Sequence, residues 1–192
     1  MRGIRHVDVL AEPTDALIYS TNIMLNCTGG VGGALMARYG PHVQTELHDI
    51  LRQRGVRLAD QGEVFDYVPA GLPYRHLIHT LPCDGMYDTT PEIVADVLAR
   101  ALTICATDPS VRRVALSALA TGYGHLQFEE FVLLADPIFQ DRRFESIEDI
   151  VLCIEDGTTY DLAREIIQER ELSLEIGGRT SGCSEPSQSS GR

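Results

Sequence analysis

The chain has 192 residues, no lysine and a formal net charge of −12. Its length suits one domain with an ample core, and its negative charge argues against general binding to nucleic acid, whose phosphates it would repel. No apolar stretch is long enough to span a membrane, and the N-terminus has no apolar signal core. We therefore expect a cytoplasmic protein that does not bind membranes. The five cysteines, at irregular spacing, indicate neither disulfides nor a metal site.

The first half of the chain alternates between apolar runs and longer segments with helical spacing. Residues 7–10 are predicted as the first strand and 16–21 as the second. A helix is expected over 34–53, with a break or bend near Gly40 and Pro41. The alternating pattern of 62–68 and the apolar run of 75–80 predict two further strands.

The second half continues this alternation. Pro91 suits the first turn of a helix whose apolar residues recur at helical spacing. A strand is predicted over 113–119, a helix from about 128, and a last strand over 150–154; Asp156 or Thr158 could cap a final helix over 160–170. Strands that alternate with helices predict a layered α/β fold with a mostly parallel sheet. Residues 1–175 are expected to form one domain, followed by a disordered polar tail over 176–192.

The most informative stretch is residues 22–35, where Gly29, Gly30, Gly32 and Gly33 lie between a predicted buried strand and a helix. Backbone N–H groups can converge on an anion at such a turn, and a Cβ would hinder the close approach of a ligand. The stretch therefore predicts a phosphate-bearing ligand held mostly by the main chain.

Two known glycine patterns fit this loop poorly. A Walker-type loop needs a lysine, and the chain has none. The dinucleotide pattern G-x-G-x-x-G/A begins at Gly30, but Leu35 stands where its third glycine or alanine would be. The alternative that the glycines serve only for tight packing is weakened by a second loop, 120–125, which follows another predicted strand. Two glycine turns at the carboxyl ends of strands could form opposite walls of one crevice.

With these elements in place, the chain resembles the macro domain family, which binds ADP-ribose, of the type that processes ADP-ribose 1″-phosphate. The resemblance covers about residues 4–172. It rests on Val7-Asp8, on the strand 15–22 ending in Asn22, on Gly29-Gly30-Val31, on the strand 74–79 ending in Ile78-His79, and on the second loop, 119–124. It implies a three-layer α/β/α fold with a mixed, mostly parallel sheet.

The resemblance also implies roles for individual residues. Asp8 would accept a hydrogen bond from the adenine amino group, and Asn22 would contact the distal ribose. An apolar or aromatic side chain would pack on adenine, with Ile154 and Tyr160 as candidates. Two loop segments would supply N–H donors to the diphosphate: Gly29, Gly30, Val31, Gly32 and Gly33, and Thr121, Gly122, Tyr123 and Gly124. No cofactor is implied.

The departures from the family pattern bear on catalysis. Many hydrolytic members place Asp directly after the valine of the glycine run and His four residues later; these positions are Gly32 and Met36 here. His125, beside the second loop, is the best remaining acid–base candidate, although a simple loop histidine is the plainer interpretation. Cys27 would need a base to act as a nucleophile, and none is identifiable.

Smaller expectations concern the remaining polar residues. His76 and His79 are three apart on a strand, so they should face opposite sides and share no metal. Asp84 and Asp88 flank Gly85 in a polar loop and are candidates for the pocket rim.

Three functions are compatible with these patterns. The first is a module that binds ADP-ribose, free or attached to protein. The second is a hydrolase that removes ADP-ribose from protein or processes O-acetyl-ADP-ribose or the 1″-phosphate, with Asn22 positioning the ribose and His125 assisting. The third, a nicotinamide-dependent oxidoreductase, is disfavoured by the missing third glycine.

Overall fold

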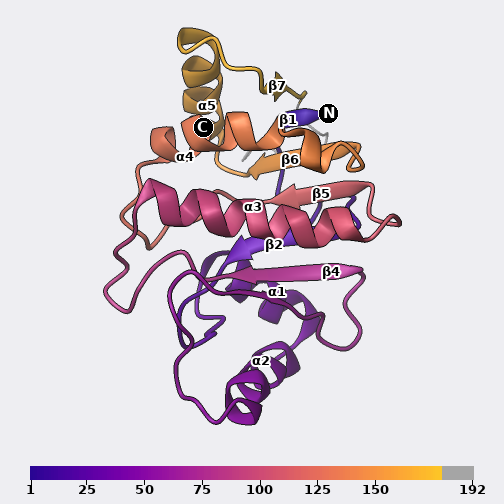
Figure 1. Cartoon of the computed structure of the whole chain (residues 1–192), viewed down its shortest axis with the longest axis vertical. Helices are drawn as coiled ribbons and strands as arrows, with labels where there is room; N and C mark the ends of the chain where they lie inside the picture. Colours follow the sequence, from indigo (N-terminus) through magenta and orange to yellow (C-terminus); the bar gives the residue numbers. More distant parts are fainter. Residues whose placement is uncertain (179–192) are drawn as a thin grey trace, which may run out of the picture.

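The computed structural model describes residues 1–178, and its centre is a mixed, mostly parallel sheet. The strands are β1 (Arg2–His6), β2 (Ala16–Ser20), β3 (Val64–Asp66), β4 (His76–Thr80), β5 (Arg113–Leu116), β6 (Asp149–Ile154) and β7 (Glu175–Ile176). Their order is β3-β4-β2-β5-β6-β1-β7. Within the described residues only the β3–β4 pair is antiparallel, and the arrowheads of β2, β4, β5 and β6 point to one side (Figure 1).

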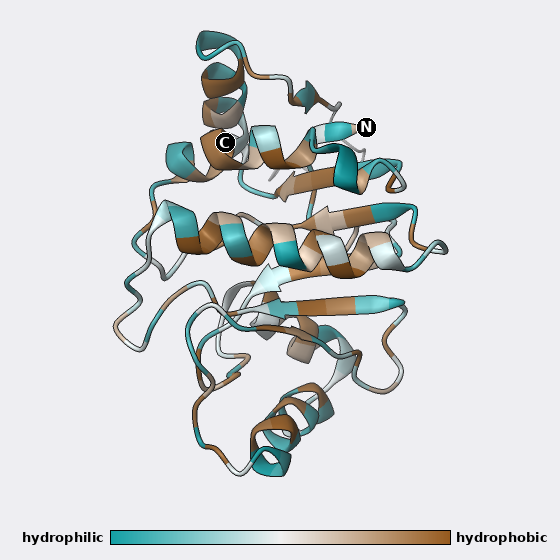
Figure 2. Ribbon diagram, viewed as in Figure 1, coloured by the Kyte–Doolittle hydropathy of each residue, from teal (hydrophilic) through white to brown (hydrophobic). Residues whose placement is uncertain are grey.

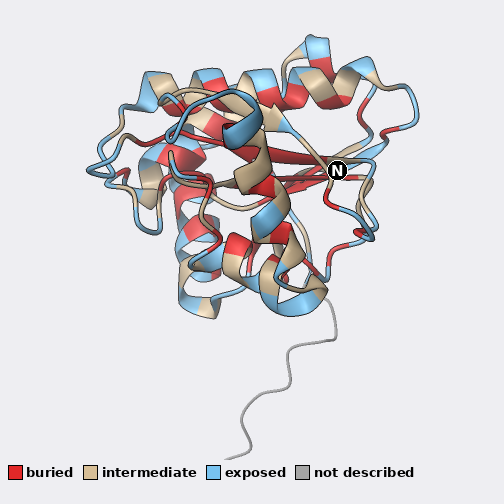
Figure 3. Ribbon diagram, turned by 90° about the horizontal axis from the view of Figure 1, so that it is seen from below, coloured by how far each residue is buried: buried red, intermediate tan, exposed pale blue. Residues whose placement is uncertain are grey.

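Helices cover both faces of the sheet, which confirms the three-layer prediction. They are α1 (Gly30–Tyr39), α2 (His42–Gln53), α3 (Pro91–Thr107), α4 (Phe128–Phe139) and α5 (Gly157–Glu169), with a short 3-10 helix, η1 (Arg142–Phe144). Apolar residues of α3, α4 and α5 form one core against the sheet, and those of α1 and α2 form a second core on the other face. The central strands β2, β4, β5 and β6 have apolar middle residues (Figure 2) and lie buried between the helical layers (Figure 3).

Strict alternation along the strands supplies both cores. Ile18 and Leu152 face α3–α5, whereas Leu17 and Val151 belong to the α1–α2 side. In-register pairing places Leu17 between Leu77 and Ala115. Neighbouring strands therefore present apolar side chains in rows across each face, as expected for a parallel sheet buried on both sides.

The prediction of a first strand over residues 7–10 was wrong. The strand is β1, at Arg2–His6, and only the N–H of Val7 extends its ladder, by donating to Ile154 O at 3.0 Å. Asp8 then turns the chain, because its Oδ1 accepts a hydrogen bond from the N–H of Leu10. The side chains of Val7, Val9 and Leu10 are buried in the turn, so their apolar character does not mark a strand.

The predicted helix over 34–53 is two helices. α1 begins at Gly30, and Gly40 ends it with a φ of 107°, a conformation that favours glycine. Pro41 then precedes α2, in agreement with the expected break. The later helices occur near their predicted positions, and β3, β4 and β5 are shorter than predicted: β5 ends at Leu116 instead of residue 119. The prediction that residues 150–154 form the last strand was wrong, because β7 follows α5.

The two histidines of β4 have separate environments. His79 is fully buried, its Nδ1 lies 2.6 Å from the hydroxyl of Tyr19, and its Nε2 lies 2.9 Å from the carbonyl oxygen of Tyr67. His76 instead lies between the carboxylates of Asp66 and Asp108. Burial lowers the pKa of His79 to about 4. For His76 burial also lowers the pKa, but the hydrogen bonds to the two carboxylates outweigh it and raise the pKa overall.

The C-terminal end of the described chain pairs with β1. Ile176 lies opposite Ile4 in the ladder, and the N–H of Gly177 donates to Ile4 O at 2.9 Å. Ile176, where the predicted polar tail was expected to begin, is therefore part of β7. The rest of that predicted tail from residue 179 on, including Cys183, lies outside the described residues. Across residues 1–178 none of the helices combines the length and apolar character needed to cross a membrane.

Candidate ligand-binding site

A cavity of about 490 Å³ lies at the carboxyl ends of the parallel strands. Its walls come from four strand ends: 20–22 at the end of β2, Cys83 and Tyr87 after β4, 117–118 and 120–124 after β5, and 153–156 at the end of β6. This is the side of the sheet to which the arrowheads point (Figure 1). A crevice at this edge of an open α/β sheet is the usual position for a ligand.

The first glycine loop brings the N-terminus of α1 into this cavity. Gly29 caps the helix in an extended conformation, with no side-chain cap and no acidic residue in the first turn. By contrast, α3 and α5 are capped by the side chains of Thr90 and Asp156. Unpaired N–H groups and the positive end of the helix dipole therefore face the cavity, which suits an anion.

Only part of the predicted glycine segment lines the cavity. Gly29, Gly30 and Val31 do, together with Thr28. Gly32 and Gly33 do not: a Cβ on Gly32 would lie 3.2 Å from Cα of Cys27. The N–H of Gly33 already donates to Gly29 O at 3.0 Å. These last two glycines thus serve the packing of α1, the alternative considered for the whole loop.

Asn22 lines the cavity and also holds the loop in shape. Its Oδ1 accepts hydrogen bonds from the N–H groups of Met24 and Asn26, both at 3.1 Å, and its Nδ2 donates to Asn26 O at 3.2 Å. The side chain of Asn26, which sequence reasoning missed, also lines the cavity and contacts Nε2 of His48 at 2.9 Å. The side-chain amide of Asn22 is therefore mostly engaged in hydrogen bonds within its own loop.

Cys27 lies beneath this loop instead of within the cavity. Its thiol is buried, and burial raises its pKa above the ordinary value. Its N–H donates to Oε1 of Gln44 at 2.6 Å. The thiol is thus protonated near neutral pH, which agrees with a structural role.

The second loop, 121–124, lines the opposite wall as predicted. Tyr123 reaches across to the first loop, so that a Cβ built on Gly29 would lie 2.5 Å from its hydroxyl oxygen. Gly124 packs where no side chain fits, because a Cβ there would lie 2.3 Å from Ala120 O and 2.7 Å from Sγ of Cys83.

His125 lies just outside the cavity lining and joins two loops. Its N–H donates to Tyr87 O at 3.2 Å, and its Nδ1 lies 2.8 Å from a carboxylate oxygen of Asp88. The imidazole is 66% exposed. The structure therefore places the candidate catalytic histidine at the rim, where it ties the loop between β4 and α3 to the second glycine loop.

The two candidates for packing on adenine lie in different places. Ile154 lines the cavity at the end of β6. Tyr160 is buried: its ring stacks on His6 at a centroid distance of 5.1 Å, and its hydroxyl donates to Gly177 O. Asp8 follows β1, the neighbour of β6, and does not itself line the cavity.

Sequence reasoning missed several lining residues, chiefly Phe128, Asp156, Thr159 and Tyr87. Phe128 was predicted only as a helix start and Asp156 only as a cap, although Phe128 begins the helix after the second glycine loop and Asp156 ends the wall segment 153–156. The position of Tyr87 depends on the fold of the loop between β4 and α3, and no local pattern predicts it.

Backbone strain is concentrated around the cavity. Among the described residues, four non-glycine residues have a positive φ, and three of them are Leu25 (55°), Tyr87 (65°) and Ala120 (61°). One lies in each of the loops that follow β2, β4 and β5. Such conformations cost free energy and persist where surrounding contacts enforce them, often at functional sites.

Comparisons with known proteins agree with this geometry. The family model described as Macro domain matches residues 18–135. An uncharacterised protein of Thermoplasma acidophilum is 31% identical over 128 residues, and the match spans 65% of this chain and 64% of that protein, just under two thirds of its length.

Solved structures share the fold at low identity. A variant macrodomain of Oceanobacillus iheyensis, solved with ADPR, has a TM-score of 0.74 at 20% identity and covers 88% of this chain and 92% of its own. The Trypanosoma brucei macrodomain in complex with ADP-ribose has a TM-score of 0.67 at 18% identity, covering 85% of this chain and 68% of its own. Because the family model matches more than half of the chain, this protein belongs to the macro domain family.

Proposed function

We propose that the protein binds ADP-ribose, free or attached to a protein, in the cavity between the two glycine loops. The observation that carries this proposal is the uncapped N-terminus of α1, which faces the second loop, 121–124, across the cavity. Backbone N–H groups on both walls suit a diphosphate in a chain that has no lysine. The relatives solved with ADPR and with ADP-ribose have the same fold.

The order of the strands suggests how the ligand lies. β6 and β1 end on one side of the cavity, where Ile154 could pack on adenine and Asp8 could accept from its amino group through Oδ2, since Oδ1 holds the N–H of Leu10. β2 and β4 end on the other side, where Asn22 and Tyr87 would lie near the distal ribose. The diphosphate would then lie between the two loops.

The chemistry at the distal end favours binding over hydrolysis. Asn22 is engaged in the loop, and burial raises the pKa of the Cys83 thiol to about 11. His125 lies outside the lining. Among the described lining residues the carboxylates are Glu155 and Asp156, at the β6 end. The distal end of the described lining therefore offers no general base near neutral pH.

Titration calorimetry tests the proposal with three ligands: ADP-ribose, AMP and inosine diphosphate ribose, in which an oxygen replaces the adenine amino group. We expect ADP-ribose to bind most tightly. The inosine analogue should bind about ten- to a hundredfold more weakly, because its oxygen would face the carboxylate of Asp8.

Asp8→Ala should bring the ratio of the dissociation constants of the inosine analogue and ADP-ribose close to one. Asp161→Ala, which removes an exposed carboxylate of α5, should leave that ratio at its wild-type value. Saturation with ADP-ribose at a hundred times its dissociation constant should stabilise the fold by about 2.7 kcal/mol. Absence of binding heat with ADP-ribose would remove the proposed function. Release of ADP-ribose from a modified protein faster than in buffer would contradict the absence of turnover.

A further inference from the structure

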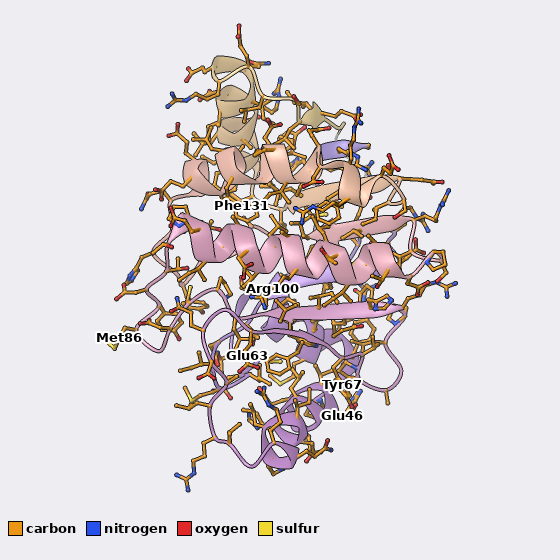
Figure 4. The ribbon with its side chains drawn as sticks, in the orientation of Figure 1. Glu46, Glu63, Tyr67, Met86, Arg100 and Phe131 are labelled. Atoms are coloured by element: carbon orange, nitrogen blue, oxygen red, sulfur yellow. The ribbon has the colours of Figure 1, made fainter. Side chains whose placement is uncertain are left out.

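Exposed apolar side chains gather at one end of the cavity. Four of the large apolar residues that the described chain exposes, Met24, Met86, Tyr87 and Tyr123, lie in the loops after β2, β4 and β5. Met86 is 74% exposed and projects from the molecule on the side to which the parallel strands point (Figure 4). Gathered apolar surface beside a cavity indicates an interaction site.

The centre of this surface is a pair of aromatic rings, Tyr87 and Tyr123, which we call the tyrosine pair. The two ring centroids lie 6.0 Å apart with an interplanar angle of 35°. Both residues line the cavity, and both are exposed, Tyr123 by 69%. Their faces are thus available to a group that leaves the cavity at the β2–β4 end.

A carboxylate accompanies the tyrosine pair. Asp88 directly follows Tyr87, and its side chain is 69% exposed. Its Oδ1 contacts Nδ1 of His125, and within the described residues its Oδ2 accepts no hydrogen bond. Asp84 is less available, because its Oδ1 accepts from the N–H groups of Met86 and Asp88. Aromatic faces beside a free carboxylate oxygen form the usual environment for an organic cation.

We propose that the tyrosine pair and Asp88 receive a planar cationic group attached to C1″ of the distal ribose of a bound ADP-ribose. This inference rests on the proposed function, because the ribose must lie at the β2–β4 end. Two sources carry this chemistry: the guanidinium of an ADP-ribosylated arginine, and the nicotinamide ring of the intact dinucleotide NAD⁺. A planar cation can stack on a tyrosine face while Asp88 compensates its charge.

The same arrangement disfavours other substituents. A phosphate on C1″ would face Asp88 in a chain with a net charge of −12, and the repulsion would weaken its binding. A neutral hydroxyl or ester would gain neither stacking nor charge compensation. The charge and planarity of the C1″ substituent should therefore determine which derivative of ADP-ribose is preferred.

Two pairs of ligands isolate the charge. NAD⁺ and NADH differ mainly in the positive charge of the nicotinamide, and an ADP-ribosyl-arginine peptide can be compared with an ADP-ribosyl-serine peptide of the same flanking sequence. Titration calorimetry should show the cationic member of at least one pair binding about two- to fivefold more tightly. The pair with the larger preference identifies the source. Equal or weaker binding of both cationic members would overturn the inference.

Variants assign the preference to residues. Asp88→Asn removes the charge but keeps an oxygen that can accept from His125, so the two loops stay joined. Tyr123→Leu removes one exposed ring. Each should bring the ratio of dissociation constants within a pair towards one. Asp96→Asn, an exposed position on α3 with the same change in net charge, should leave the ratio at its wild-type value.

The outcomes separate the two proposals. A protein that binds ADP-ribose but does not prefer either cationic ligand retains the proposed function and refutes the inference. A protein that does not bind ADP-ribose loses both. A preference that survives Asp88→Asn and Tyr123→Leu would show that these side chains do not provide the cation site.

Discussion

Acidification should destabilise the fold through His79, which lies in a buried chain of hydrogen bonds with Tyr19 and Tyr67. Burial lowers the pKa of His79 from 6.5 to about 4. The unfolded chain therefore binds the proton more readily. The stabilisation is fully present above pH 6.5 and is lost as the pH falls towards the folded pKa. Proton linkage between the unfolded and folded pKa values lowers the free energy of unfolding by about 2 kcal/mol at pH 5. The total loss, reached well below the folded pKa, is about 3 kcal/mol.

Urea unfolding of the wild type and of His79→Gln, at several pH values between 7 and 5, measures this loss. Glutamine can accept from Tyr19 and donate to the carbonyl of Tyr67 but does not titrate. The carboxylates of the two proteins titrate alike, so the difference between their free energies of unfolding should shrink by about 2 kcal/mol over this range. Parallel pH profiles would refute the argument, even if the variant is less stable throughout.

Three further predictions concern the packing of Gly124, the hydroxyl of Tyr19 and the titration of His76. Gly124→Ala should destabilise the fold by about 1–3 kcal/mol, because the new Cβ would lie 2.3 Å from Ala120 O; Gly122→Ala, with no atom within 4 Å, should melt at the wild-type temperature, and equal melting of both variants would contradict the packing argument. Tyr19→Phe removes the hydroxyl from the buried chain and should cost about 1–3 kcal/mol at pH 7 in urea unfolding; a change below about 0.5 kcal/mol would show that the hydrogen bond adds little. His76 has a raised pKa, so its stabilisation is fully present below pH 6.5 and is lost as the pH rises through its folded pKa. Denaturation midpoints should therefore fall across that range in the wild type and less in His76→Gln, and an equal fall in both would count against this assignment.

The central strands were predictable because they are buried on both faces, which makes a short continuous apolar run out of each strand. β1 was not, because it carries Arg2 and Arg5. The guanidinium of Arg2 donates to carbonyl oxygens of Phe144 and Ile147, and Arg5 pairs with Glu12. These partners are distant in the sequence or follow an unpredicted turn, so no local pattern shows that the two charges can lie in a strand.

Both glycine loops could be predicted because an anion cradle requires residues of a particular kind at particular positions. The loop between β4 and α3, which also borders the cavity, could not be predicted from the sequence. Its shape depends on Asp84, which accepts two backbone N–H groups of its own loop, and on His125, which contacts Asp88 from another. The choice between Ile154 and Tyr160 likewise depends on how α5 packs against β1, which the sequence alone does not determine.

The strained residues Leu25, Tyr87 and Ala120 have a consequence for engineering. A glycine at Ala120 would relieve the backbone strain there but would let the loop sample more conformations. A library of variants selected only for heat resistance would therefore accumulate substitutions in these loops that lower the population of the binding-competent conformation. Selection for ligand affinity would retain the strain. At this rim the two goals call for opposite substitutions, so a useful biosensor built from this chain should gain its robustness from the helices and leave the three loops untouched.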